Sequence, residues 1–205
     1  MVKTTERRER QREALVLAAE QAIAEKGLGG LKARDLAEAI GCSLGAIYNL
    51  VQDMDELVLR VGSRTLARLD AALAEATSGS ETALDSKAAD TLVAIAQTYC
   101  AFARENLQLW RTLFEHRMAE GSTVPEWAIS EQMTMFRYIL APLRVIQPEA
   151  SELDLILLSR TLSSAVHGVV MLGLEEKLVA VPAAALDGQI ETLVRVIGNG
   201  LKQGA

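Results

Sequence analysis

Aromatic residues, prolines and cysteines are all scarce in this sequence. Aromatics make up only 4% of its 205 residues, and Ala and Leu carry much of the apolar content, which favours helices over sheets. The four prolines stand at positions 125, 142, 148 and 182, so the first 124 residues contain none of these helix breakers. Together these shortages predict an all-α fold.

Long apolar runs and metal-binding cysteine patterns are also missing. No run reaches the roughly 18–20 apolar residues of a membrane span, and the charged start MVKTTERRERQRE differs from the apolar region of a signal peptide. The two cysteines, Cys42 and Cys100, lack metal-ligand spacing. We therefore expect a cytoplasmic protein with no membrane contact, no metal and no cofactor.

Positive charge is in deficit over the whole chain but is concentrated near its start. The formal net charge is −6, yet residues 1–50 hold 8 Lys and Arg against 7 Asp and Glu. The first dozen positions alone contain Lys3, Arg7, Arg8, Arg10 and Arg12. A local basic segment can bind phosphates although the protein is acidic overall. The same residues also fit the solvated start of an ordinary helix.

Hydrophobic periodicity divides the chain into helices separated by short breaks. In the first of them, Leu15, Ala18, Ala22 and Ile23 form one apolar stripe. The predicted helices cover 6–26, 33–40, 44–50, 54–76, about 86–104, about 107–117, about 126–146 with an interruption near Pro142, about 150–174 and about 186–202. The stretch 77–82 is the clearest loop between them.

Residues 33–48, ARDLAEAIGCSLGAIY, predict a helix-turn-helix. Ala37 is small enough for two helices to approach closely, Gly41 supplies the positive φ that ends the first helix, and Ser43 can cap the second. The second helix of such a unit enters the DNA major groove. The residues presented to DNA would be Leu44, Gly45, Ala46 and Asn49.

The last two predicted helices differ in how apolar residues are distributed around them. Helix 186–202 carries a single apolar stripe, whereas 153–174 is apolar nearly all round and must therefore be buried on every side. One of its faces can pack on its own domain and another on a second subunit, so that about 150–174 and 186–202 from two copies form a four-helix homodimer interface. A central core helix of a monomer would show the same pattern.

The basic first helix, the helix-turn-helix and the long helical remainder together resemble the TetR family of bacterial transcriptional regulators. The family's Ala-x3-Gly-x-Ser core, small-residue turn and aromatic residue are matched by Ala37, Gly41, Ser43, Gly45 and Tyr48. The resemblance implies that Tyr48 reaches a DNA phosphate and that Ser43, Asn49 and Arg34 lie at the DNA face. A ring packed on Ile40 is the structural alternative for Tyr48.

This resemblance also implies the domain organisation and the function. Residues 1–52 would form the helix-turn-helix DNA-binding domain, with Arg7 and Arg8 gripping phosphates, and 53–205 the helical ligand-binding and dimerisation domain. The protein would be a dimeric repressor, released from a palindromic double-stranded DNA operator by a small, largely apolar or aromatic effector.

The chain departs from the family's pattern just after Tyr48. Family members usually continue Tyr-x-His-Phe and place a Lys at the start of the next helix, but Leu50, Val51 and Met54 stand at these positions. The phosphate contact assigned to that Lys is therefore missing. This departure leaves open a second function, in which a TetR-fold protein has lost operator binding and acts through a ligand or a protein partner.

The ligand site is expected among the middle helices, where six of the eight aromatic residues lie. Aromatics and methionines at helical spacing line apolar pockets, although they more often form core. The predicted pocket residues are Tyr99, Phe102, Trp110, Phe114, Met133, Phe136 and His167.

His167 also belongs to a second resemblance. The pair His167–Gly168 resembles the end of the Trp-x-x-x-His-Gly signature of one TetR ligand-domain class. The Trp of that signature is absent, since Ser163 and Ser164 occupy its neighbourhood. A core histidine that is hydrogen-bonded to a neighbouring carbonyl is the alternative interpretation.

An enzyme is not expected. Gly41-Cys42-Ser43-Leu44-Gly45 matches the G-x-S-x-G elbow of hydrolases, but that elbow needs a strand before the serine and a helix is predicted there. The sequence also contains no phosphate loop, dinucleotide fingerprint or H-E-x-x-H motif.

Overall fold

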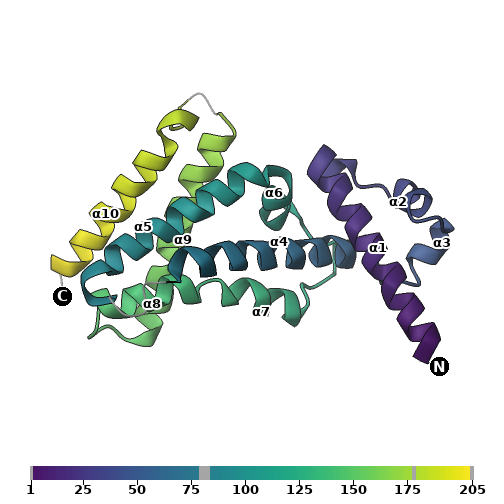
Figure 1. The fold of residues 1–205 in the computed structure, drawn as a ribbon, viewed down its shortest axis with the longest axis horizontal. Helices are drawn as coiled ribbons and strands as arrows, with labels where there is room; N and C mark the ends of the chain where they lie inside the picture. The colour runs from purple at the N-terminus through teal and green to yellow at the C-terminus, as the bar shows by residue number, and fades with distance from the viewer. Residues whose placement is uncertain (1, 79–83, 177–178, 204–205) are drawn as a thin grey trace. The chain divides into compact units, whose positions relative to one another are not determined.

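The computed structural model describes residues 2–78, 84–176 and 179–203, and this part of the chain is helical without strands, which confirms the predicted all-α fold. The α-helices, drawn in Figure 1, are α1 (Val2–Lys26), α2 (Ala33–Ala39), α3 (Leu44–Ile47), α4 (Met54–Thr77), α5 (Leu84–Glu105), α6 (Leu107–Glu115), α7 (Glu126–Thr134), α8 (Arg137–Ile146), α9 (Glu152–Leu174) and α10 (Leu186–Gln203). Two short 3-10 helices are η1 (Leu28–Gly30) and η2 (Ala183–Ala185). The expected loop at 77–82 lies largely outside the described residues.

The chain forms two compact units. Unit 1 contains residues 1–67 and 106–129, and unit 2 contains residues 68–105 and 130–205. The predicted division into a DNA-binding part, 1–52, and a ligand-binding part, 53–205, concerns function and stays a prediction.

Unit 1 is built around the apolar stripe of α1. Leu15 and Ile23 of that stripe are fully buried and pack with Leu36 of α2, Ile47 of α3 and Leu57 of α4. Because these residues come from four helices, burial of their side chains fixes α2 and α3 against α1. Arg64 of α4 adds an ion pair, in which its Nε donates to Glu20 of α1 at 2.5 Å.

The turn between α2 and α3 is a Schellman motif. The backbone N–H of Gly41 donates to Glu38 O at 3.1 Å and that of Cys42 donates to Ala37 O at 2.9 Å. Gly41 has φ 66°, the left-handed conformation predicted for it. Ser43 occupies the N-cap position of α3, but its side chain makes no capping hydrogen bond, so the expected cap is wrong in that detail.

Helix α4 begins with a variant of the capping box, in which the Glu56 side chain reaches the residue before the N-cap. Asp53 Oδ1 accepts the N–H of Glu56 at 2.7 Å, and Glu56 Oε2 accepts the N–H of Gln52 at 2.6 Å. Burial raises the pKa of Glu56, but the hydrogen bond from Gln52 and the ion pair with Arg60 outweigh it and hold that pKa below its ordinary value. Both carboxylates therefore have structural roles at the helix start.

Unit 2 is organised around α5, which packs against α8, α9 and α10 (Figure 1). Fully buried residues at these contacts include Leu143 of α8, Val170 of α9 and Ile190 of α10. At the surface, Arg104 of α5 pairs with Asp187 of α10 at 3.0 Å. The four helices form the framework in which the pocket described below lies.

The stretch 126–146 is two helices rather than the one helix expected. The break lies at Met135 and Phe136, whose N–H groups bond three residues back, to Gln132 O and Met133 O, instead of four. Pro142, where an interruption was expected, is instead inside α8 and buried. The change of helix axis thus precedes the proline.

Helix α9 is long enough and apolar enough to span a membrane, judged by length and composition alone. Of its most apolar 18-residue stretch, 28% is buried. This differs from the expectation that nothing in the chain has the composition of a span. Leu155, Leu162, Val166 and Val170 of α9 are nevertheless buried, and the helix packs on α5, α8 and α10. These contacts are those of a core helix.

The Schellman motif makes Gly41→Ala a test of the turn. No heavy atom lies within 4 Å of a Cβ built at Gly41, so the cost is conformational and we expect a loss of about 1–2 kcal/mol in the free energy of unfolding. Gly45→Ala, in α3 and equally uncrowded, is the matched control and should leave stability unchanged or slightly raised. Urea denaturation measures both, and equal stabilities would contradict the turn geometry.

Candidate nucleic-acid interface and internal pocket

The helix-turn-helix of unit 1 exposes most of the residues predicted to meet DNA. Ile47 is fully buried and Leu50 nearly so, which turns the remaining positions of α3 outward. Tyr48 is 50% exposed and Leu44 42% exposed. Arg34, Ser43, Gly45 and Asn49 are exposed as well, and Ala46 is partly buried.

The exposed arginines of unit 1 differ in their partners. Arg12 is paired with Glu9, and Arg10 Nε donates to Glu6 O at 3.3 Å. Arg7, Arg8 and Arg34 are exposed and form no ion pair with any residue that the structure describes. Their guanidinium groups are therefore available to phosphates.

The positions that depart from the TetR pattern lie in the core of unit 1. Leu50 and Val51 belong to the buried cluster, and Met54 packs against it. A Met at position 54 therefore contributes apolar contacts instead of a surface cation. The neighbouring Asp55 accepts the N–H of Ala119 at 2.8 Å and lies 3.5 Å from His116 Nε2. The acidic start of α4 thus anchors the segment after α6.

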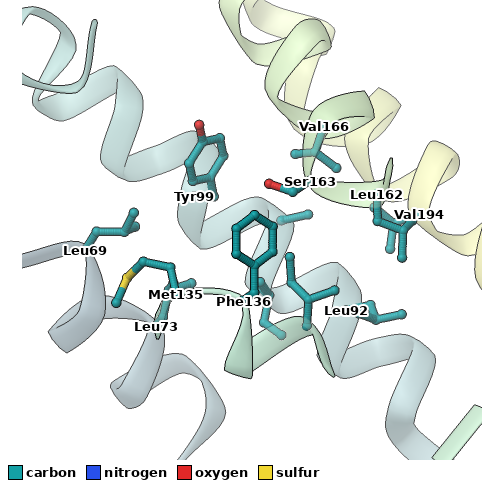
Figure 2. A pocket seen from close by; sticks show the side chains of 13 residues that line it. Leu69, Leu73, Leu92, Tyr99, Met135, Phe136, Leu162, Ser163, Val166 and Val194 are labelled. Carbon is teal, nitrogen blue, oxygen red and sulfur yellow. The ribbon is translucent and has the colours of Figure 1, made fainter. Parts of the chain in front are cut away.

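Unit 2 contains an apolar pocket with a cavity volume of about 100 Å³ (Figure 2). Its walls come from the second half of α4, α5, the α7–α8 break, α8, α9 and α10. Its lining residues are Leu69, Leu73, Leu92, Ile95, Ala96, Tyr99, Met135, Phe136, Ile139, Leu162, Ser163, Val166 and Val194.

Two of the seven residues predicted for a ligand site, Tyr99 and Phe136, come together in this pocket. The other five do not line it. Phe102 is buried in unit 2, Trp110 and Phe114 belong to unit 1 and contact each other edge to face at 5.5 Å, Met133 is exposed, and His167 lies beside Tyr99.

Aliphatic residues make up most of the lining, and sequence reasoning did not single them out. Leu69, Leu92 and Leu162 have the same helical spacing as ordinary core leucines. No signal in the sequence distinguishes an apolar side chain that meets another from one that meets a cavity.

The polar contact nearest the pocket joins α5 to α9. Tyr99 Oη lies 2.8 Å from His167 Nδ1. Burial lowers the pKa of His167, so the neutral imidazole is favoured. Its Nδ1 can then accept a hydrogen bond from the Tyr99 hydroxyl. His167 is thus a hydrogen-bonded histidine, as in the alternative raised from the sequence, but its partner is the Tyr99 hydroxyl and not the carbonyl expected there. The Trp-x-x-x-His-Gly class stays a prediction.

Within the part of the chain that the structure describes, no three His, Cys, Asp or Glu side chains are grouped to hold a metal ion. Ser43 follows helix α2 rather than a strand, so the context of a nucleophile elbow is missing.

The lowered pKa of His167 predicts a pH-dependent stability. In the unfolded chain, the His167 side chain takes up a proton as the pH falls below about 6.5, whereas in the folded protein it does so only at a lower pH. The free energy of unfolding is therefore highest above pH 6.5 and decreases as the pH falls toward the lowered pKa of the folded state. We expect His167→Gln to remove this component from unfolding free energies measured between pH 7.5 and 5. His116→Gln is the control and should retain it, and an unchanged profile in His167→Gln would refute the assignment.

Comparisons with known proteins agree with this fold. The family model for the tetracyclin repressor-like C-terminal domain matches residues 92–197, just over half of the chain. No curated protein sequence has significant similarity to the chain.

Solved structures of low sequence identity share the fold. A protein of unknown function from Rhodococcus sp. RHA1 is 20% identical, with TM-score 0.66 and coverage of 95% of this chain and 94% of that one. The TetR-family transcriptional regulator PfmR from Thermus thermophilus is 19% identical, with TM-score 0.57 and coverage of 92% and 97%. NalD of Pseudomonas aeruginosa, the secondary repressor of the MexAB-OprM multidrug efflux pump, is 19% identical, with TM-score 0.54 and coverage of 91% and 96%.

The family match begins within α5 and ends within α10, a stretch that contains most of the pocket residues, and the helix-turn-helix lies ahead of it in the same chain. The chain therefore belongs to the TetR family of transcriptional regulators, which are ligand-responsive DNA-binding proteins and not enzymes.

Proposed function

We propose that this protein is a dimeric repressor that acts in the cytoplasm and leaves a palindromic operator when a small, largely apolar effector binds in unit 2. The observation that carries the proposal is the helix-turn-helix, whose core side is buried and whose outer side exposes Tyr48, Asn49 and Arg34. The name of NalD, a repressor of an efflux pump, supports the choice of repressor over activator.

The exposed residues of the helix-turn-helix divide into two kinds of DNA contact. Leu44, Gly45 and Ala46 would lie in the major groove, where they offer apolar contact but no side-chain hydrogen bonds. Ser43, Tyr48, Asn49 and Arg34 would bind phosphates or base edges. Because few polar groups face the bases, DNA shape would contribute to specificity.

Two arginines near the N-terminus, Arg7 and Arg8, would compensate for the missing lysine at the position of Met54. Arg7 and Arg8 are exposed and form no ion pair with described residues, so each can neutralise a phosphate. Each phosphate contact releases counterions, and affinity would therefore fall steeply with salt concentration.

The proposed dimer uses the outer faces of α9 and α10. On α9, Leu153, Leu157 and Leu172 are 65%, 52% and 50% exposed, and on α10, Val196 is 66% exposed. The exposed leucines share one face of α9, since they are spaced by four and fifteen residues. Two such helices from each copy would form a four-helix interface with two-fold symmetry.

The proposed response to a ligand involves α4. This helix contributes Leu57 and Val61 to the core of unit 1 and Leu69 and Leu73 to the pocket of unit 2. A two-fold dimer must hold its recognition helices about 34–36 Å apart to enter successive major grooves. A ligand that favours a different position of α4 would shift the population away from DNA, and DNA would weaken ligand binding equally.

The DNA-binding proposal is tested with Arg34→Ala and Tyr48→Phe. Each removes one contact to a charged group, and we expect operator affinity to fall about tenfold or more while thermal unfolding stays unchanged. Electrophoretic mobility shift on the intergenic DNA flanking the gene measures the effect at low and moderate salt. Arg117→Ala, an exposed arginine outside the helix-turn-helix, is the matched control and should bind like the wild type.

No shift on that DNA, together with no enrichment from a random-sequence pool, would contradict operator binding. The favoured function would then be a TetR-fold protein that acts through its ligand or a protein partner.

The dimer proposal is tested with Leu157→Glu. A buried charge without a partner opposes association, so we expect the variant to sediment as a monomer at concentrations where the wild type is a dimer. Leu17→Glu, at a leucine of α1 that is 46% exposed, is the control and should leave the dimer intact. A monomeric wild type in analytical ultracentrifugation would refute this interface.

A further inference from the structure

The pocket of unit 2 has a chemical signature that narrows its ligand. None of its lining side chains is charged, and only Tyr99 and Ser163 carry a hydroxyl group (Figure 2). Because desolvating an ionised group without a partner is costly, such a lining selects against carboxylates and ammonium groups. The titratable group beside the pocket, His167, does not line it and is engaged by Tyr99.

The two hydroxyl groups are not equivalent. The Tyr99 hydroxyl is paired with His167 at 2.8 Å. The Ser163 hydroxyl forms no hydrogen bond with any residue that the structure describes. Figure 2 shows its oxygen directed to the side where Tyr99 and Phe136 lie.

Two other hydroxyl groups of α9, those of Ser159 and Thr161, differ from that of Ser163. Ser159 Oγ donates to Ile156 O at 2.8 Å, and Thr161 Oγ1 donates to Leu157 O at 2.9 Å. Both groups are satisfied by the helix itself, as is usual for serine and threonine within helices. Ser163 therefore keeps a donor and an acceptor available inside an otherwise apolar pocket.

The volume of the pocket indicates the size of the ligand portion that fits inside it. At about 100 Å³ it is somewhat smaller than an apolar protein cavity of about 150 Å³ that binds benzene. Without rearrangement, the space suits a single ring or a short branched chain. It does not suit a fused polycyclic or drug-sized molecule, for which pockets of about 300–1,000 Å³ are typical.

We propose that the pocket binds a small, uncharged molecule with an apolar body of single-ring size and one hydrogen-bonding group, and that the Ser163 hydroxyl binds that group. This inference rests on the proposed function, since it specifies the chemical class of the effector. Ser163 thereby determines specificity, and the aliphatic lining supplies most of the affinity.

The test compares benzene, phenol and benzoate, which share a ring and differ only in the polar group, by calorimetry on the full-length protein. The wild type should bind phenol more tightly than benzene and should bind benzoate undetectably at neutral pH. Ser163→Ala should lower the affinity for phenol about 5- to 20-fold, toward that for benzene, and should leave the affinity for benzene unchanged.

Ser164→Ala is the matched control, because this neighbouring serine is exposed and does not line the pocket. It should bind all three compounds like the wild type. Benzoate binding as tight as that of phenol, or an unchanged ratio of phenol to benzene affinity in Ser163→Ala, would overturn the proposal.

Calorimetry without DNA separates this inference from the proposed function. If operator DNA is bound but none of the three compounds is, the ligand class is wrong and the DNA-binding function stands. If phenol binds as expected but no DNA is bound, the ligand class stands and the repressor function fails.

Discussion

Burial along α4 is the constraint on which both units depend. Leu57 and Val61 complete the core of unit 1, and Leu69 and Leu73 close one side of the pocket in unit 2. The capping box at Asp53 fixes where this 24-residue helix begins, and with it which residues fall on the buried stripe. A shift of α4 by one residue would expose leucines and bury charges in both units, so the register of this helix is tightly specified.

At the start of α4, residues that stabilise the fold stand where the TetR pattern has a phosphate-binding lysine. Met54 packs on the core at the position where the TetR pattern has a lysine, while Asp53 and Glu56 satisfy backbone N–H groups at the helix start. Asp55 binds the segment after α6. The acidic residues in this run therefore have structural roles. In the proposed DNA complex, phosphates would be bound by Arg7, Arg8 and the exposed face of the helix-turn-helix instead.

The pocket shows how an apolar interior becomes selective. Most of its lining consists of aliphatic side chains, which bind apolar bodies without discriminating among them. Discrimination requires a polar group placed in that apolar setting, because an unpaired buried donor or acceptor is costly. The Tyr99 hydroxyl has a protein partner in His167, whereas the Ser163 hydroxyl has none among the described residues. In the proposed ligand site, selectivity would therefore depend on which hydroxyl group the fold leaves unsatisfied.

The sequence by itself determined the all-α fold and the helix-turn-helix, because the 3.6-residue apolar spacing and the turn at Gly41 are local properties of neighbouring residues. It could not determine the break at Met135 and Phe136, which coincides with residues facing a cavity rather than with the nearby Pro142. It also could not separate Tyr99 and Phe136, which line the pocket, from Trp110 and Phe102, which fill cores. All four have the same chemistry and similar spacing, and only the packing of helices distant in sequence decides whether a ring meets other side chains or empty space.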